Sequence, residues 1–177
     1  MKIAAHESAK SRRSRHAEQV ILFTVSHQMF AVAAESVQEI RSTDSLGGAA
    51  SEIEQPVVSK VRHSFERAHR IYYAVNACAH FNLPVTRPTL VLILRQRRVG
   101  VLVDKIERMA DIQAVHPLPH AFTGDECRWY RGLAYVEDHV IPVIEPSGFL
   151  TREEFELLDR ATNSAESHHQ LEGAVRA

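Results

Sequence analysis

The sequence predicts a mainly β fold of the small-barrel type, and two matching passages are the main evidence for it. Residues 90–109 and 129–150 each contain an apolar run, a polar turn and a second apolar run. Tandem hairpins rich in β-branched residues favour a small β-barrel over a helical bundle. Neither passage holds a candidate catalytic group, and such hairpins build surfaces for docking. The sequence therefore favours a binding module.

Composition sets the outer limits of this interpretation. The chain has 177 residues, of which 45% are hydrophobic and 24% charged, close to the average for a globular domain. Its formal net charge of −1 gives no overall attraction to nucleic acid or to an anionic membrane. No apolar run reaches the ~18 residues that a spanning helix needs, and the N-terminus lacks the apolar stretch of a signal peptide. We therefore expect a soluble cytoplasmic protein.

The chain divides into three parts by pattern. Residues 1–17 are polar, mostly small and basic, without an apolar period, which predicts a disordered basic arm. Residues 18–161 carry the patterned segments and should form the folded domain, as one unit or two small lobes. The polar residues 162–177 predict a flexible C-terminal tail.

The first patterned segment predicts a hairpin followed by a helix. The runs VILFTV and MFAV flank a short polar turn at residues 26–28, as in a β-hairpin. In the next stretch, AESVQEIR, Val37 and Ile40 lie three residues apart, which predicts a short helix with one apolar side. The small residues around 47–56 then predict a loop.

The middle of the chain is less regular. Strands are expected at residues 57–58 and 71–75, and the charged, glycine-free stretch 59–70 between them predicts a locally helical or irregular connection. After the hairpin of the 90–109 passage, Asp104 is expected to cap a single helical turn that runs to Met109.

The last patterned segment predicts a helix against the barrel. Thr151 is a suitable N-cap and Glu154 follows three residues later, which is the spacing of a capping box. Leu150, Phe155 and Leu158 give the helix an apolar stripe. The pattern ends near Ala161.

Metal binding and catalysis find little support. His116 and His120 stand four residues apart, with Cys127 seven further on. Pro117 and Pro119 prevent the regular helix that would bring the histidines onto one face, so ordinary loop residues are expected. Nucleophile, helical zinc and phosphate-loop motifs are all missing. We expect no enzyme activity, no cofactor and no metal, and a metal- or ligand-binding barrel stays as an alternative.

A second alternative is a small-barrel nucleic-acid-binding protein. Arg95, Arg97 and Arg98 cluster at one turn, and the basic arm could add to them. Acidic residues are equally numerous in the chain, so an ordinary barrel surface explains the cluster as well.

Four passages together resemble a known family. They are VQEIR at 37–41, RRVGVLVDKIERM at 97–109, YRGLAYVEDHVIPVIE at 130–145 and EEFELLDRA at 153–161. Their order and spacing are similar to those of CheW-like domains, over residues 18–161. The resemblance implies two packed five-stranded SH3-like β-barrels with short helices and a C-terminal helix.

The resemblance also implies a function. CheW-like proteins are cytoplasmic, non-catalytic scaffolds of bacterial chemosensory arrays, which link methyl-accepting chemoreceptor tips to the regulatory domain of a CheA-type histidine kinase. Carried over by position, the partner-binding residues would be Val37, Glu39, Ile40, Arg41, Arg131 and Gly132. The last two fall in the second hairpin, where the family's repeated Arg-Gly pattern occurs.

One stretch departs from the family pattern. Where the family has a Gly-Val-x-Asn-Leu-Arg-Gly stretch, this chain has residues 63–69, HSFERAH. Arg67 stands one position away from the family's arginine and is the candidate to replace it as a partner-binding residue. Because a shift of one residue in a strand reverses the face of a side chain, a divergent module with a different protein partner is a further hypothesis.

Overall fold

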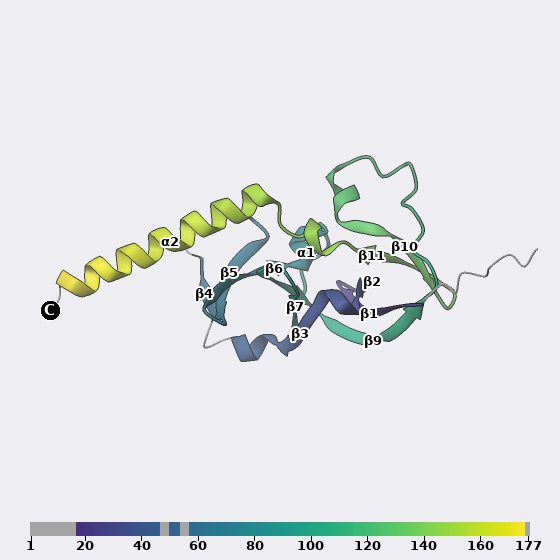
Figure 1. The fold of residues 1–177 in the computed structure, drawn as a ribbon, viewed down its shortest axis with the longest axis horizontal. Coiled ribbons are helices and arrows are strands. Elements are labelled where there is room, and N and C mark those ends of the chain that lie inside the picture. The colour runs from purple at the N-terminus through teal and green to yellow at the C-terminus, as the bar shows by residue number, and fades with distance from the viewer. Residues whose placement is uncertain (1–16, 47–49, 54–56, 176–177) are drawn as a thin grey trace, which may run out of the picture.

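The computed structural model describes residues 17–46, 50–53 and 57–175, and shows two curved β-sheets and a long C-terminal helix (Figure 1). The strands are β1 (Glu18–Val25), β2 (Gln28–Ala33), β3 (Val37–Ser42), β4 (Ala50–Glu52), β5 (Val61–Arg67), β6 (Arg70–Asn76), β7 (Leu90–Leu94), β8 (Val99–Val103), β9 (Lys105–Ile112), β10 (Tyr130–Val136) and β11 (His139–Ile144). The helices are α1 (Ala77–His80) and α2 (Arg152–Val175), with the 3-10 turns η1 (Ala34–Ser36), η2 (Thr43–Leu46), η3 (Asp125–Arg128) and η4 (Pro146–Gly148). The predicted mainly β fold is confirmed.

The strands form two sheets that we call sheet A and sheet B. Sheet A has the order β10-β11-β2-β1-β9, and sheet B the order β3-β7-β8-β6-β5-β4. The two outermost strands of sheet A, β9 and β10, contact each other, so sheet A curls into a barrel. Sheet B has one strand more than the five that the resemblance implies, because the three-residue β4 adds to its edge. Sheet A is built from both ends of the chain and sheet B from the middle.

The central strands are apolar on both faces, which explains their unbroken hydrophobic runs. In β1, Val20 and Leu22 point into the interior of sheet A, whereas Ile21 and Phe23 belong to a core that both sheets share. Strands β6 and β7 alternate in the same way between the interior of sheet B and the shared core. Since successive side chains of a strand point to opposite faces, a strand between two cores must be apolar throughout. We call the shared cluster the interlobe core.

Three hairpins agree with the sequence, and their turns hold four of the described non-glycine residues with positive φ, namely Ser26, His27, Gln96 and Glu137. β1–β2, β7–β8 and β10–β11 are antiparallel pairs at the predicted places. Ser26 and His27 both have positive φ, of 49° and 65°, as a two-residue hairpin turn requires.

Two predicted helical pieces are strands instead. The expected helix over residues 34–41 is the single turn η1 followed by β3, in which Val37 is buried and Ile40 exposed. The expected turn from Asp104 to Met109 is the start of β9, because pairing with β1 satisfies its backbone groups. The Asp104 carboxylate instead accepts hydrogen bonds from the Ser26 N–H at 2.7 Å and from the Thr86 hydroxyl at 2.6 Å.

The charged stretch between the expected strands was also predicted wrongly. Residues 61–67 form β5, which pairs antiparallel with β6 with a register shift between Val61 and His63, and residues 57–58 are not in a strand. The turn between β5 and β6 contains no glycine, so no sequence pattern marked it. Ala68 and His69 in this turn have φ values of 49° and 58°. Residues 47–49 and 54–56 of the expected loop lie outside the described residues, as does the predicted basic arm except for Ala17.

Helix α2 begins where the sequence predicts but ends later. The Thr151 N–H donates to the Glu154 carboxylate at 2.8 Å and the Glu154 N–H donates to the Thr151 hydroxyl at 3.2 Å, which is a capping box. The helix continues to Val175, past the predicted end at Ala161, and extends away from the sheets in Figure 1. Flexibility of residues 162–177 stays a prediction.

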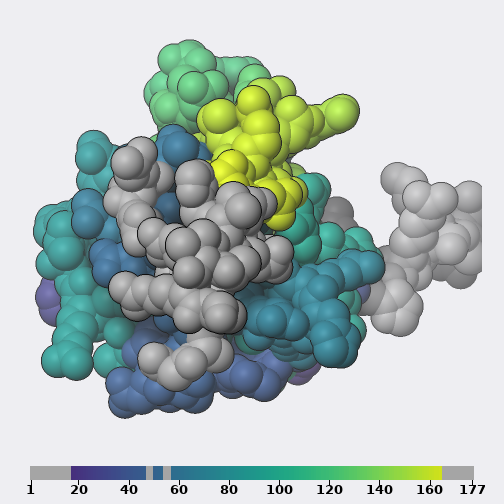
Figure 2. Space-filling view, turned by 90° about the vertical axis from the view of Figure 1, so that its left-hand side faces the viewer, coloured from purple at the N-terminus to yellow at the C-terminus, as the bar shows by residue number. Residues whose placement is uncertain are grey.

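One polar cluster holds α2 on sheet B. The Arg98 guanidinium donates to both Asp159 oxygens, at 3.0 and 2.6 Å, and the Tyr73 hydroxyl also bonds to Asp159. The hydrogen bonds from Arg98 lower the pKa of Asp159, while burial raises the pKa of Tyr73 to about 12. Figure 2 shows α2, in yellow-green, resting on the body of the protein. No helix in the described ranges is long and apolar enough to cross a bilayer.

Candidate functional site

Strand β3 is an edge strand of sheet B and carries most of the predicted partner-binding residues. It pairs with β7 on one side and with no other strand among the described residues. Ile40 is 40% exposed there, a large hydrophobic side chain on an open sheet edge. Unpaired main-chain groups beside an exposed apolar side chain form a template for another protein. We call Glu39, Ile40, Arg41 and Arg67 the β3 edge cluster.

Ion pairs join the three charged residues of the β3 edge cluster. The Glu39 carboxylate accepts hydrogen bonds from the guanidinium of Arg41 and, at 3.0 Å, from that of Arg67 on β5. The bond from Arg41 is the main cause that lowers the pKa of Glu39, and Arg67 adds to it. Arg67 also lies over the Tyr72 ring at 5.9 Å. Despite its shift in sequence, Arg67 thus reaches β3 and joins two distant strands of sheet B.

The cluster has two sides. Glu39 and Arg41 pair with Ile93 and Val91, which face the interior of sheet B. Ile40 pairs with Leu92 and so faces the side of the interlobe core. A partner that docks along β3 would therefore contact a charged rim on one side and an apolar residue on the other.

Two of the predicted partner-binding residues are inside the fold. Val37 is 7% exposed and belongs to the interlobe core. Gly132 is buried at a bulge in β10, where its φ is 151° and an added Cβ would lie 2.1 Å from the His116 carbonyl oxygen. Both positions shape the strands that carry the exposed residues, and contact with a partner at either stays a prediction.

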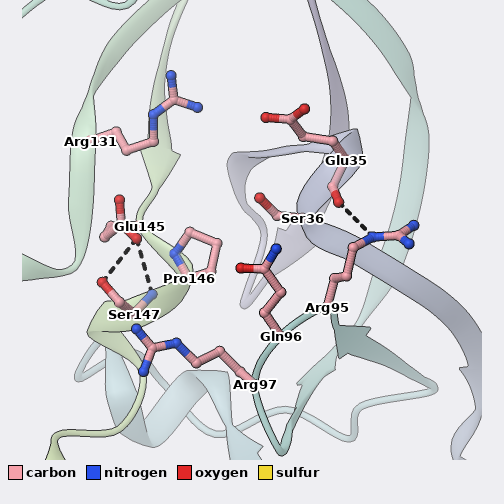
Figure 3. Close-up of a pocket in the computed structure, with 9 residues that line it drawn as sticks. All are labelled: Glu35, Ser36, Arg95, Gln96, Arg97, Arg131, Glu145, Pro146 and Ser147. Carbon is pink, nitrogen blue, oxygen red and sulfur yellow. Dashed lines mark hydrogen bonds between the residues drawn. The ribbon is translucent and has the colours of Figure 1, made fainter.

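Arg131 lies apart from the β3 edge cluster, in a cleft at the junction of the two sheets. The cleft has a volume of about 520 Å³, and we call it the interlobe cleft. It is lined by Glu35, Ser36, Arg95, Gln96, Arg97, Arg131, Glu145, Pro146 and Ser147 (Figure 3). Arg131 is held by Glu18 through a bidentate ion pair, which lowers the pKa of Glu18. Sequence patterns gave no sign of this cleft, because its residues come from four separate turns and strands.

His116 and Cys127, named for the metal alternative, and two of the arginines named for the nucleic-acid alternative have contacts within the fold. The His116 ring packs edge-on against Tyr135 at 5.4 Å, and the Cys127 thiol donates to the Phe122 carbonyl at 3.0 Å. No three metal-ligating side chains are grouped within the part of the chain that the structure describes. Of the three arginines proposed for nucleic acid, Arg98 is neutralised by Asp159 and Arg95 is bonded to main-chain carbonyls. Neither alternative gains support.

One buried histidine has a structural consequence that sequence patterns did not reveal. His80 is 4% exposed, lies 4.7 Å from the Trp129 ring and 4.9 Å from the Phe149 ring, and its Nε2 has no partner among the described residues. Burial, with a smaller contribution from nearby Lys60, lowers the pKa of His80 to about 3. The folded state therefore keeps this ring neutral.

We expect His80 to make the protein sensitive to mild acid. The unfolded chain binds a proton at this residue below pH ~6.5 whereas the folded chain does not, so stability falls as the pH drops from ~6.5 towards 3. At pH 5 this amounts to about 2 kcal/mol relative to neutral pH. Urea unfolding of the wild type and of His80→Phe at pH 7 and pH 5 tests this, and the variant should lose about 2 kcal/mol less. An equal loss in both proteins would contradict it.

Two curved β-sheets around a shared core, with an open edge strand and a cleft at their junction, define a mainly β module of two lobes. A model of the CheW-like domain matches residues 19–154, and the chain belongs to that family. The family consists of non-catalytic chemotaxis scaffold proteins, and the chain is a CheW-like scaffold of this β-rich type.

Solved structures agree on the fold. The crystal structure of the scaffolding protein TtCheW from Thermoanaerobacter tengcongensis is similar, with a TM-score of 0.64 and 15% sequence identity. The match covers 77% of this chain and 94% of that one. At this identity the likeness shows the fold alone. No curated protein sequence matches the chain.

Proposed function

We propose that the protein is a non-catalytic cytoplasmic adaptor that bridges methyl-accepting chemoreceptor tips and the regulatory domain of a CheA-type histidine kinase. Membership of the CheW-like family supports this kind of partner. The observation that carries the proposal is the open edge of sheet B at β3, with Ile40 exposed and Glu39 fixed between Arg41 and Arg67. The interlobe cleft with Arg131 offers a second surface, as a bridge requires.

The mechanism is positioning rather than chemistry. Each contact of this class buries on the order of 1,000–1,600 Å² and is often weak, so an array holds together through many simultaneous contacts. A signal passes through the adaptor only if one state of a partner is bound more tightly than the other. Both sheets pack on the interlobe core, so a movement of one bound partner would be transmitted through this core to the other.

Reversal of one charge at the β3 edge tests the proposal. We expect Arg41→Glu to weaken binding of one of the two partners about tenfold while the other binds as before, because a rim charge is reversed and Glu39 loses a neighbour. The control is Arg87→Glu, an exposed arginine near the start of β7 that makes the same change of charge elsewhere. Titration calorimetry with receptor tips and with the kinase regulatory domain gives the affinities, and thermal unfolding confirms that both variants fold.

The possible results separate three cases. If Arg41→Glu binds both partners like the wild type, β3 is not a docking edge. If the wild type binds neither partner, the bridging proposal is wrong, and the hypothesis of a CheW-like module with a different protein partner replaces it. If Arg41→Glu loses affinity for one partner and keeps its affinity for the other, the result supports the bridging proposal.

A further inference from the structure

A single residue, Asp104, carries the chain from sheet B into sheet A. Strand β8 of sheet B ends at Val103, and β9 of sheet A begins at Lys105. The passage in the other direction, from β2 to β3, takes the three residues of η1. Because a residue has only two soft backbone angles, the conformation of Asp104 sets the direction in which the chain enters sheet A. We call this residue with its bonds the Asp104 joint.

Four polar groups of Asp104 take part in hydrogen bonds, and they divide equally between the two sides of the joint. Its N–H donates to the Thr24 carbonyl at 3.0 Å, and its Oδ2 accepts from the Ser26 N–H at 2.7 Å. Its Oδ1 accepts from the Thr86 hydroxyl at 2.6 Å, and its carbonyl accepts from the Thr89 hydroxyl at 2.5 Å. Two bonds therefore hold the first hairpin of sheet A, and two hold the connector that leads into β7 of sheet B.

The connector ties the Asp104 joint to the edge strand β3. Thr43 follows β3 directly, and its N–H donates to the Thr89 carbonyl at 2.9 Å. The Thr43 hydroxyl donates to the same oxygen at 3.2 Å. The Thr89 N–H donates in turn to the Val103 carbonyl at 3.1 Å. Thr89 is thus bonded at once to the end of β3, to the end of β8 and to Asp104, so the position of the β3 edge depends on the joint.

Hydrogen bonds add to the contact between the sheets what apolar packing lacks. The interlobe core brings the sheets together through the hydrophobic effect, which has no direction. A hydrogen bond weakens steeply when its angle departs from the favoured range. A polar network in which each member has its partner therefore favours one arrangement over others of similar buried area. The Asp104 joint is such a network, and it lies where the chain crosses between the sheets.

We propose that Asp104 is a positioning residue of the adaptor, which holds the β3 edge cluster on sheet B at a fixed angle to the surface of sheet A that carries Arg131. This deepens the proposed function, on which it rests, because a bridge between two partners requires a defined angle between its two surfaces. Asp104 itself touches neither partner. It acts through Ser26 on one side and through Thr86 and Thr89 on the other.

The first experiment measures the angle between the sheets without any partner. Residual dipolar couplings of backbone amides are recorded for the full chain. We expect one alignment tensor to fit both sheets in the wild type, and two tensors of different orientation or magnitude in Asp104→Ala. Asp104→Asn should restore the single tensor, because its amide oxygen accepts from Ser26 and its amide nitrogen donates to the Thr86 hydroxyl. A role in stability alone would leave the angle in the folded protein unchanged.

Two further variants complete this experiment. Asp111→Ala makes the same change at an exposed aspartate of β9 that lies outside the joint, and it should keep the single tensor. Thr86→Val removes one hydroxyl at nearly constant shape, so it replaces Asp104→Ala if the latter does not fold. We expect it to separate the two tensors as well. A single tensor like that of the wild type in every folded variant of the joint would overturn the proposal.

A second experiment tests the consequence for bridging. The probe is one chain in which a receptor tip and the kinase regulatory domain are joined by a flexible linker. We expect Asp104→Ala to bind each domain alone like the wild type and to bind the linked probe about tenfold more weakly, because the two surfaces are no longer held at the angle that both domains need. Equal affinities of the two proteins for the linked probe would overturn the positioning role. If the wild type binds neither domain, the bridging function is wrong, and the dipolar couplings still decide whether Asp104 sets the angle.

Discussion

Gly132→Ala is expected to destabilise the fold by about 3 kcal/mol, since it combines backbone strain with a steric clash. The φ of 151° at this position is unfavourable for any residue with a Cβ, and that Cβ would lie 2.1 Å from the His116 carbonyl oxygen. This oxygen cannot withdraw, because the His116 backbone is paired with Leu133 through hydrogen bonds of 2.7 and 2.8 Å. Urea unfolding followed by the fluorescence of the single tryptophan, Trp129, measures the loss.

Gly124→Ala is the matched control for this substitution. A Cβ at Gly124 would also approach another atom, at 2.0 Å, but that atom is the end of the Glu126 side chain, which is free to turn away. We expect a loss below about 1 kcal/mol. If both variants lose the same small amount of stability, the backbone at Gly132 is not restricted by its conformation and surroundings.

Leu158→Ala is expected to cost about 3 kcal/mol by leaving a cavity in the interlobe core. Leu158 is the fully buried residue through which α2 enters that core, with an exposed fraction of 0%. The adjacent ion pair of Arg98 and Asp159 keeps the helix in place, so the surrounding side chains are only partly able to close the gap. Urea unfolding of the variant gives the loss directly.

The neighbouring residue supplies the control. Leu157 is 40% exposed on the same turn of α2, so Leu157→Ala removes the same atoms and changes helix propensity equally. We expect it to cost less than about 0.5 kcal/mol beyond propensity. Similar losses in the two variants would mean that α2 is not anchored through Leu158.

The predictable part of the fold was the part encoded locally. The three hairpins follow from apolar runs that flank polar turns, and the start of α2 follows from Thr151 and Glu154. The segment from Ala34 to Arg41 was predicted wrongly because a three-residue apolar spacing fits a helix, while pairing with β7 made it a strand. Tertiary pairing decided between two structures that the local pattern allowed equally.

The candidate site depended on contacts that no local pattern contains. Glu39 and Arg67 are 28 residues apart in sequence, and Arg98 and Asp159 are 61 apart. Whether a charge is paired or available for a partner is decided only when these segments meet. The sequence could therefore nominate Arg41, Arg67 and Arg131 as charged surface positions, but it could not distinguish them from Arg97, the cleft arginine with no pairing partner of its own among the described residues.

The division of the chain between the two sheets also bears on how the protein emerges from the ribosome. Strands β3 to β8 are consecutive in sequence and form sheet B by themselves, whereas β1 and β2 need β9, β10 and β11 to complete sheet A. The strands of sheet B can therefore pair with one another during translation. At that stage the β1–β2 hairpin still exposes the apolar side chains that face the interior of sheet A. The open edges of the first hairpin therefore stay unpaired until β9, β10 and β11 have been made, which exposes this hairpin to aggregation for the longest time.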